Sequence, residues 1–387
     1  MSRENLLVKF NDEMPIISTS LTRDLCFQNN LLGAAYPEIF GYRIDDQTDA
    51  AHFAIVDRAI SYFHRLNDSC DLGKYENNDM WGHRLRENYF DFERALLEKD
   101  REVVSRTLRT VCETSLVTGF YLSDIMERSG NQGVAWHIFD TLLSMASAFG
   151  YPIENPEQGN HSLAGIDFEE IFDFVLQHVP ALRHPPRAGG GIFGIRIVNG
   201  VIAWRDLVAA FNATRVVENL GNLPKTICEI GGGMGSLAYY LAKMGVSSSV
   251  FDIPVVSLLQ SYFLMTNLGG DQVWIYGEDP NPSAKVRIMP WWELPSEEDS
   301  KFSLVVNVDS LPEIELDVAL NYIDLIHAKG RDLFLSINQE SRALNTGSNY
   351  QNVVGDLVAV RGGLKRTYRF PYWLRAGYVE ELYQIVK

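Results

Sequence analysis

Apolar residues in the first half of the chain recur every three or four positions, which is the spacing of one face of an α-helix. Phe53, Val56 and Ile60 are one example. The helices that this spacing predicts span residues 53–63, 85–96, 103–111, 136–149 and 168–179. The first half is therefore expected to be mostly α-helical.

The pattern changes after about residue 190. Apolar runs within 191–202 flank Asn199-Gly200, a dipeptide that favours the tight turn of a β-hairpin. A helix over 204–220 follows, and short apolar runs then alternate with helical segments. The predicted strands are 226–230, 249–251, 286–289, 303–308, 333–337, 364–370 and 379–386, and the predicted helices are 236–244, 255–268 and 318–328. This alternation predicts an α/β fold with a mostly parallel sheet covered by helices on both faces.

A change of charge coincides with the change of pattern. The chain of 387 residues has a formal net charge of −16. Residues 1–184 contain 16 Lys and Arg against 29 Asp and Glu, and the remainder contains 18 against 21. Pro and Gly residues are concentrated at 184–191, and such residues mark boundaries. We therefore predict two domains, a helical domain over 1–188 that covers the substrate and a sheet domain over 189–387.

Composition and charge exclude several kinds of protein. An acidic surface repels phosphate backbones, so a nucleic-acid partner is not expected. The sequence has no apolar stretch typical of a secretion signal or a membrane span, which predicts a cytoplasmic protein without a membrane partner. The four cysteines are more than 40 residues apart, so we expect free thiols and no zinc site. A homo-oligomer remains open.

The candidate chemistry begins in a glycine-rich loop between the first strand of the parallel series and the next helix. Glu229 precedes Gly231, Gly233 and Gly235 there, and Asp252 ends the next strand. Glycines let a ligand approach the backbone, and an acid at the second position can accept the hydroxyls of a ribose. The loop therefore predicts a nucleoside site. Its spacing also fits a dinucleotide site, so a nicotinamide cofactor is an alternative to S-adenosylmethionine.

The spacing of Glu229, Gly231, Gly233 and Gly235 resembles the first motif of class I S-adenosylmethionine-dependent methyltransferases. Later segments resemble the bacterial sugar O-methyltransferase family, and they lie at 251–254, 259–262, 307–313, 336–340 and 368–375. The resemblance covers most of residues 190–387. It implies a Rossmann-like class I methyltransferase domain with a terminal antiparallel strand, and O-methylation of a sugar or a glycosylated small molecule.

The same resemblance implies roles for the cofactor residues. Glu229 would contact the methionine amino group, the three glycines the methionine backbone, and Asp252 the ribose. Pro290 and Trp291 would pack near the adenine, although Trp291 and Trp292 could equally be core residues. Asn307 is a further residue that we expect to bind the cofactor.

Carboxylates after the fourth and fifth parallel strands are the candidate catalytic groups, because ligands of open α/β sheets bind at the carboxyl ends of strands. These residues are Asp309, Glu313 and Glu340. They could remove the proton of an acceptor hydroxyl, or Asp309 and Glu340 could hold a Mg²⁺ ion that acidifies it. The alternative for Glu313 is a structural role at the start of the next helix.

The acceptor is the least determined part of the function. Arg369 and Arg375 flank an aromatic segment that contains Trp373, and they could receive an anionic group such as a carboxylate or a phosphate. The alternative is that the two arginines lie on a solvent-exposed face of a strand and bind no ligand. Gln339 and His83 are further candidates for acceptor binding. Other functions that the sequence leaves open are methylation of another polar metabolite or natural-product intermediate, and nucleoside binding without catalysis.

Overall fold

The computed structural model describes residues 39–42, 50–69, 89–117, 123–152, 168–187, 189–342 and 351–387. His83, Cys26 and Cys70 lie outside these ranges, as does the beginning of the helix predicted over 85–96. Cys112 and Cys228 are buried, and neither forms a disulfide within the described ranges. No helix within the described ranges is long and apolar enough to cross a membrane.

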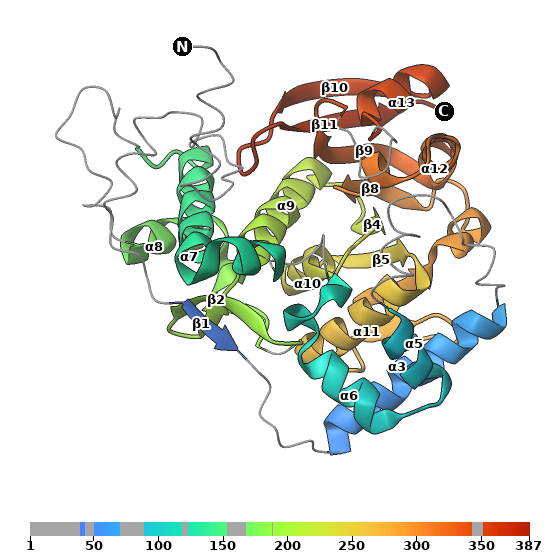
Figure 1. The fold of residues 1–387 in the computed structure, drawn as a ribbon. Coiled ribbons are helices and arrows are strands. Elements are labelled where there is room, and N and C mark those ends of the chain that lie inside the picture. The colour runs from blue at the N-terminus through green and yellow to red at the C-terminus, as the bar shows by residue number, and fades with distance from the viewer. Residues whose placement is uncertain are drawn as a thin grey trace, which may run out of the picture.

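A twisted sheet of eight strands forms the centre of the second half (Figure 1). Its strands in spatial order are β10 (Leu364–Pro371), β11 (Tyr378–Ile385), β9 (Gly330–Gln339), β8 (Phe302–Val308), β4 (Thr226–Ile230), β5 (Ser247–Asp252), β7 (Val286–Pro290) and β6 (Val273–Ile275). The strands from β9 to β6 run parallel, and β11 is antiparallel to β9 and β10. The expected Rossmann-like α/β fold with a terminal antiparallel strand is therefore confirmed.

Both faces of the central strands β4 and β8 are buried, which explains why these strands are nearly continuous apolar runs instead of alternating ones. On β8, Leu304 and Val306 face the helices α9 (Trp204–Leu220), α10 (Ser236–Lys243) and α11 (Pro254–Leu268). Phe302 and Val305 face the opposite side, where α12 (Leu316–Lys329) and α13 (Val354–Arg361) pack. Two hydrophobic cores therefore enclose the sheet.

The first half supplies the helices α3 (Ala50–Ser69), α5 (Phe90–Leu97), α6 (Arg101–Arg109), α7 (Ser123–Ala148) and α8 (Phe168–His178). α3 packs along α11, and α7 packs along α9. Arg58 of α3 pairs with Glu278 at 2.7 Å, beside the sheet edge at β6. The apolar residues of these helices belong to the same core as α9–α11.

Some elements differ from those predicted. The hairpin of β2 (Ile192–Ile197) and β3 (Gly200–Ile202) forms at the Asn-Gly turn as expected, but β1 (Ile39–Tyr42) adds a third, antiparallel strand. α7 begins 13 residues before the helix predicted there. The three-residue strand β6 and the helix α13 were missed, because segments this short have little periodicity.

Candidate functional site

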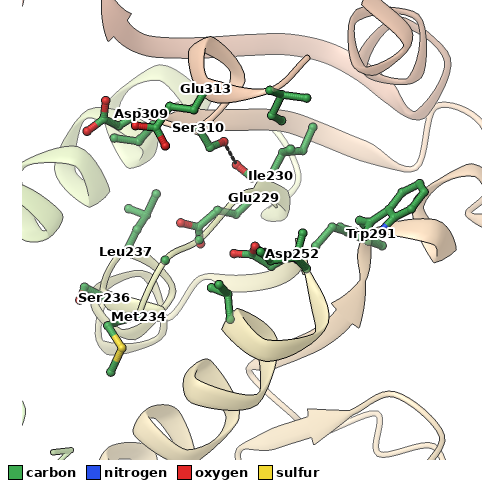
Figure 2. Close-up of a pocket in the computed structure, with 18 of the residues that line it drawn as sticks. Glu229, Ile230, Met234, Ser236, Leu237, Asp252, Trp291, Asp309, Ser310 and Glu313 are labelled. Atoms are coloured by element: carbon green, nitrogen blue, oxygen red, sulfur yellow. Dashed lines mark hydrogen bonds between the residues drawn. The ribbon is translucent and has the colours of Figure 1, made fainter. Parts of the chain in front are cut away.

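A cavity of about 340 Å³ lies at the carboxyl ends of β4, β5 and β8, where an open parallel sheet binds its ligands. Figure 2 shows side chains from the glycine-rich loop, from the end of β5 and from the turn after β8 around the same space. Helix α9 closes one side through Arg205, Val208 and Asn212. The volume is within the range of small-molecule and cofactor sites.

The glycine-rich loop needs its glycines for two reasons. Gly231, Gly233 and Gly235 have φ values of 72°, 55° and 84°, a region that other residues rarely adopt. A Cβ on Gly231 would lie 2.2 Å from Ser310 Oγ, so the loop can approach the turn after β8 only with glycine there. Gly235 is the N-cap residue of α10, and Gly231 and Gly233 line the cavity.

Glu229 is the most unusual group of the cavity wall. It is 3% exposed, and its Oε2 has no hydrogen-bond partner. Burial is the main cause that raises the pKa of Glu229, and the negative charge of Asp252 raises it further, to about 8. A buried carboxyl group without a partner is costly, and a ligand cation would remove that cost.

Asp252 ends β5 and also lines the cavity (Figure 2). It accepts hydrogen bonds from the Ile253 N–H at 2.8 Å and from Gln260 Nε2 at 2.6 Å. Burial raises the pKa of Asp252 to about 7, against the lowering effect of these donors and of the N–H groups of Gly232 and Gly233. Glu229 and Asp252 thus bring two acids to one cavity.

The candidate adenine residues and Asn307 lie at different depths. Trp291 lines the cavity and meets Trp292 edge to face at 6.0 Å, and Pro290 is the last residue of β7. Asn307 is fully buried and contacts protein atoms: its Nδ2 donates to the Ile230 carbonyl at 2.9 Å and to Ser310 Oγ. Asn307 therefore ties the glycine-rich loop to the turn after β8.

Asp309 is held in a strained conformation at the cavity wall. Its φ is +60°, and its backbone N–H donates to Asn338 Oδ1 at 2.9 Å. Its two carboxylate oxygens accept hydrogen bonds from Arg375 at 2.5 Å and from the Tyr378 hydroxyl at 2.6 Å. Strain of this kind persists where the surrounding contacts impose it, and it is concentrated at functional sites.

Glu313 lines the same cavity from a short 3-10 turn, Leu311–Glu313. The N-cap position of α12 belongs to Glu315, so Glu313 does not cap that helix. Figure 2 shows Asp309, Ser310 and Glu313 together on one side of the cavity.

The remaining candidates lie outside the cavity wall. Glu340 pairs with Arg369 at 3.3 Å, and Arg369 also contacts Glu381 at 3.5 Å. Gln339 donates to Gln351 at 2.7 Å, and Trp373 is 44% exposed. Among the acceptor candidates, Arg375 contacts Asp309, a residue that lines the cavity.

The donor set does not support the Mg²⁺ hypothesis. Asp309 and Glu340 are each paired with an arginine, Arg375 and Arg369 respectively. Across the described ranges, no three His, Cys, Asp or Glu side chains are grouped as metal ligands would be. Mg²⁺ is usually held by one or two carboxylates and several waters, and both of these carboxylates are engaged by arginines, which fits ion pairs better than a cation site.

Sequence reasoning missed three residues of the site. Arg205 lines the cavity from α9, Gln260 bonds to Asp252, and Tyr378 bonds to Asp309. A polar Gln260 among the apolar residues of a buried helix was an available sequence signal. Nothing in the local pattern distinguishes the other two.

Comparisons with known proteins give fold-level similarity only. No known protein family and no curated protein sequence matches the chain. Among solved structures, magnesium protoporphyrin IX methyltransferase from Synechocystis PCC 6803 with bound SAH is 17% identical at a TM-score of 0.35, covering 47% of this chain and 83% of that one. The 1,6-didemethyltoxoflavin-N1-methyltransferase of Burkholderia thailandensis is 16% identical at a TM-score of 0.36, covering 47% of this chain and 79% of that one. A TehB-like SAM-dependent methyltransferase of Corynebacterium glutamicum is 18% identical at a TM-score of 0.33, covering 47% of this chain and 94% of that one.

Proposed function

We propose that this protein transfers a methyl group from S-adenosylmethionine to a hydroxyl of a sugar or a glycosylated small molecule. The observation that carries the proposal is the buried, unpartnered Oε2 of Glu229 in the cavity that Asp252 also lines. A nucleoside with a cationic amino-acid group satisfies both acids, since the ribose hydroxyls donate to one and the ammonium to the other. A nicotinamide dinucleotide has no such ammonium group.

The residues around the two acids fit the other parts of the cofactor. Gly231 and Gly233 line the cavity in backbone conformations that favour glycine, and Trp291 offers an aromatic face for the adenine after Pro290. Asn307 supports this wall from behind through Ile230 and Ser310. S-adenosylmethionine would supply a methyl group activated by its bond to a sulfonium sulfur, and transfer of that methyl group to the acceptor oxygen would break the carbon–sulfur bond and leave S-adenosylhomocysteine.

The protein's part in the reaction is alignment and proton removal. Each carboxylate oxygen has two acceptor sites, so Asp309 keeps one on each oxygen after bonding to Arg375 and Tyr378. We assign to Asp309 the orientation of the acceptor hydroxyl and to Glu313, on the same wall, the removal of its proton. The Arg375–Asp309 pair also offers donors and acceptors that suit a polyhydroxylated acceptor. An acceptor with an added anionic group, bound by Arg369 or Arg375, is the alternative.

Calorimetry with S-adenosylhomocysteine tests the cofactor assignment. Wild type is expected to bind it, and Asp252→Ala is expected to lose affinity at least tenfold because the ribose loses a charged hydrogen-bond acceptor. Asp279→Ala removes an exposed acid of the same domain and serves as the control. Unchanged binding by Asp252→Ala, or thermal stabilisation by NADH and not by S-adenosylhomocysteine, would refute the assignment.

The acceptor class requires a turnover experiment. Wild type is incubated with methyl-labelled S-adenosylmethionine and a panel of nucleotide sugars, glycosylated metabolites and other polar metabolites, and the products are identified by mass spectrometry. Label on a sugar oxygen supports the proposal. Label on another polar metabolite contradicts the sugar assignment, and cofactor binding without label transfer to any acceptor contradicts catalysis.

A further inference from the structure

Gln260 is a fully buried amide on α11 that contacts Asp252. Its Nε2 donates to Asp252 Oδ2 at 2.6 Å, one of the shorter side-chain hydrogen bonds of the site. Its Oε1 is buried without a hydrogen-bond partner. A polar side chain in this position has a cost that apolar packing alone does not explain.

The same amide lies close to Glu229. A Cβ placed on Gly232 would lie 3.2 Å from Gln260 Nε2 and 3.2 Å from Glu229 Cδ. The amide and the carboxyl group therefore border one small space beside the glycine-rich loop. Both have an unpartnered buried oxygen, Oε1 of Gln260 and Oε2 of Glu229.

We propose that Gln260 is a positioning residue of the cofactor site, which fixes the Asp252 carboxylate in the orientation that receives the ribose. This inference rests on the proposed function and extends it to a residue that does not line the cavity. The Ile253 N–H holds one oxygen of Asp252 and Gln260 holds the other, so the plane of the carboxylate is set. The carboxylate therefore has a fixed orientation before the ligand arrives.

The Gln260 amide is a neutral hydrogen-bond donor, and the acidic groups around Asp252 make such a donor important for the charged form of Asp252. Asp252 raises the pKa values of three acidic groups around it, Glu229 from β4, Tyr62 from α3 and Tyr89 just before α5. The amide N–H favours the charged form of Asp252 without introducing a charge of its own. Loss of this donor is therefore expected to raise the pKa of Asp252.

Gln260→Met tests the inference because methionine keeps the length of the side chain and removes both polar atoms. We expect the Kd for S-adenosylhomocysteine to rise about tenfold or more, and the pH at which affinity is lost on acidification to move upward. The affinity for 5′-methylthioadenosine, which has the adenosine but no amino-acid group, should fall by a similar factor. Glu229→Gln should weaken S-adenosylhomocysteine and leave 5′-methylthioadenosine unchanged.

Three comparisons separate positioning from general structural damage. In an Asp252→Ala background, Gln260→Met should have little further effect on affinity, because its partner is already gone. Ser261→Ala removes a neighbouring buried hydroxyl that bonds to the Leu258 carbonyl, so it should alter stability without shifting the pH profile. Gln260→Glu, which replaces the donor by an acid, should bind less well as the pH rises, and it provides a second variant if Gln260→Met does not fold.

The outcomes distinguish this inference from the proposed function. If wild type does not bind S-adenosylhomocysteine, the proposed function fails, and the role of Gln260 fails with it. If wild type binds and Gln260→Met has the same Kd and the same pH profile, only the role of Gln260 is refuted. An equal loss of affinity in the presence and absence of Asp252 would also refute it.

Discussion

At the scale of single residues, the cavity holds acids where folding alone would favour neutral groups. Glu229 and Asp252 are both buried, and each has a pKa well above that of an exposed carboxyl group. Burying such groups destabilises the protein, and functional sites often accept this cost because the ligand needs the charge. We therefore expect that replacing either acid by its amide raises the stability of the ligand-free protein and lowers its affinity for the cofactor.

Glu229→Gln is expected to stabilise the ligand-free protein at pH 8.5 and to weaken cofactor binding. The amide keeps the shape of the side chain and removes the charge whose burial is unfavourable. We expect a higher thermal midpoint than wild type at that pH, and at least a tenfold loss of affinity for S-adenosylhomocysteine, since its ammonium loses a charged partner. Thermal scans and calorimetry measure the two effects. A variant that is stabilised and binds normally would show that Glu229 does not meet the ammonium.

At the scale of elements, three loops are joined around the cavity. The glycine-rich loop after β4 meets the turn after β8 through Ser310, which donates to the Ile230 carbonyl at 3.1 Å. The connection between β10 and β11 then reaches this turn through Arg375 and Tyr378. The shape of the cavity thus depends on contacts between loops that belong to different strands.

Gly231→Ala should disrupt the first of these contacts. Its Cβ would lie 2.2 Å from Ser310 Oγ, and its φ of 72° is strained for alanine. Gly245→Ala is the matched control, because Gly245 has a φ of 74° but open space around its Cβ position. We expect about 1 kcal/mol of destabilisation for the control, and more for Gly231→Ala together with loss of S-adenosylhomocysteine binding. Denaturant unfolding and calorimetry compare them, and equal behaviour of the two variants would contradict the close-approach argument.

Arg375→Ala should affect the acceptor and not the cofactor. It leaves Asp309 without its cationic partner at the acceptor side of the cavity. We expect at least a tenfold loss of kcat/KM for the acceptor, with an unchanged Kd for S-adenosylhomocysteine. Arg369→Ala is the control, since Arg369 pairs with Glu340 and Glu381 outside the cavity wall. Equal losses in both variants would instead favour an anionic acceptor held by the two arginines.

At the scale of the whole molecule, the helical first half and the sheet share one hydrophobic core. Tyr62 of α3 donates to Ser257 of α11 at 3.1 Å, next to the end of β5. Arg58 donates to the Gly270 carbonyl at 2.7 Å near the sheet edge. The helices thus contribute to the dry surroundings that raise the pKa values of the cavity acids.

The global stability of the ligand-free protein should consequently depend on pH. Glu229 and Asp252 titrate near 8 and 7 in the folded state, against 4.5 and 3.8 as ordinary values. At pH values between the ordinary pKa values and the folded-state pKa values, the folded state binds more protons than the unfolded state. The free energy of unfolding therefore falls as the pH rises from about 5 to 8. Denaturant titrations should show a smaller fall for the double variant Glu229→Gln, Asp252→Asn than for wild type. The same slope in both proteins would contradict the assignment of this pH dependence to the two acids.

The sequence by itself predicted most of the elements and the loop that lines the cavity. Hydrophobic periodicity is a local property, so it located most helices and strands. Glycine spacing with Glu229 and Asp252 predicted a nucleoside site, and the structure places these residues around one cavity. Periodicity failed at β6, which is three residues long, and could not show that β1 pairs with β2 more than 150 residues away.

Only the tertiary structure decided which polar residues meet. Asp309 is 66 residues from Arg375 and 69 from Tyr378, and their contact depends on β11 pairing with β9 beside β8. Glu340 and Arg369 were equally plausible site residues from the sequence, but the antiparallel pairing of the last strands places Arg369 against Glu340 and Glu381. The physical reason is that charge and hydrogen bonding act over a few ångströms, whereas a sequence records which residues carry polar groups and not which of them the fold brings within that distance.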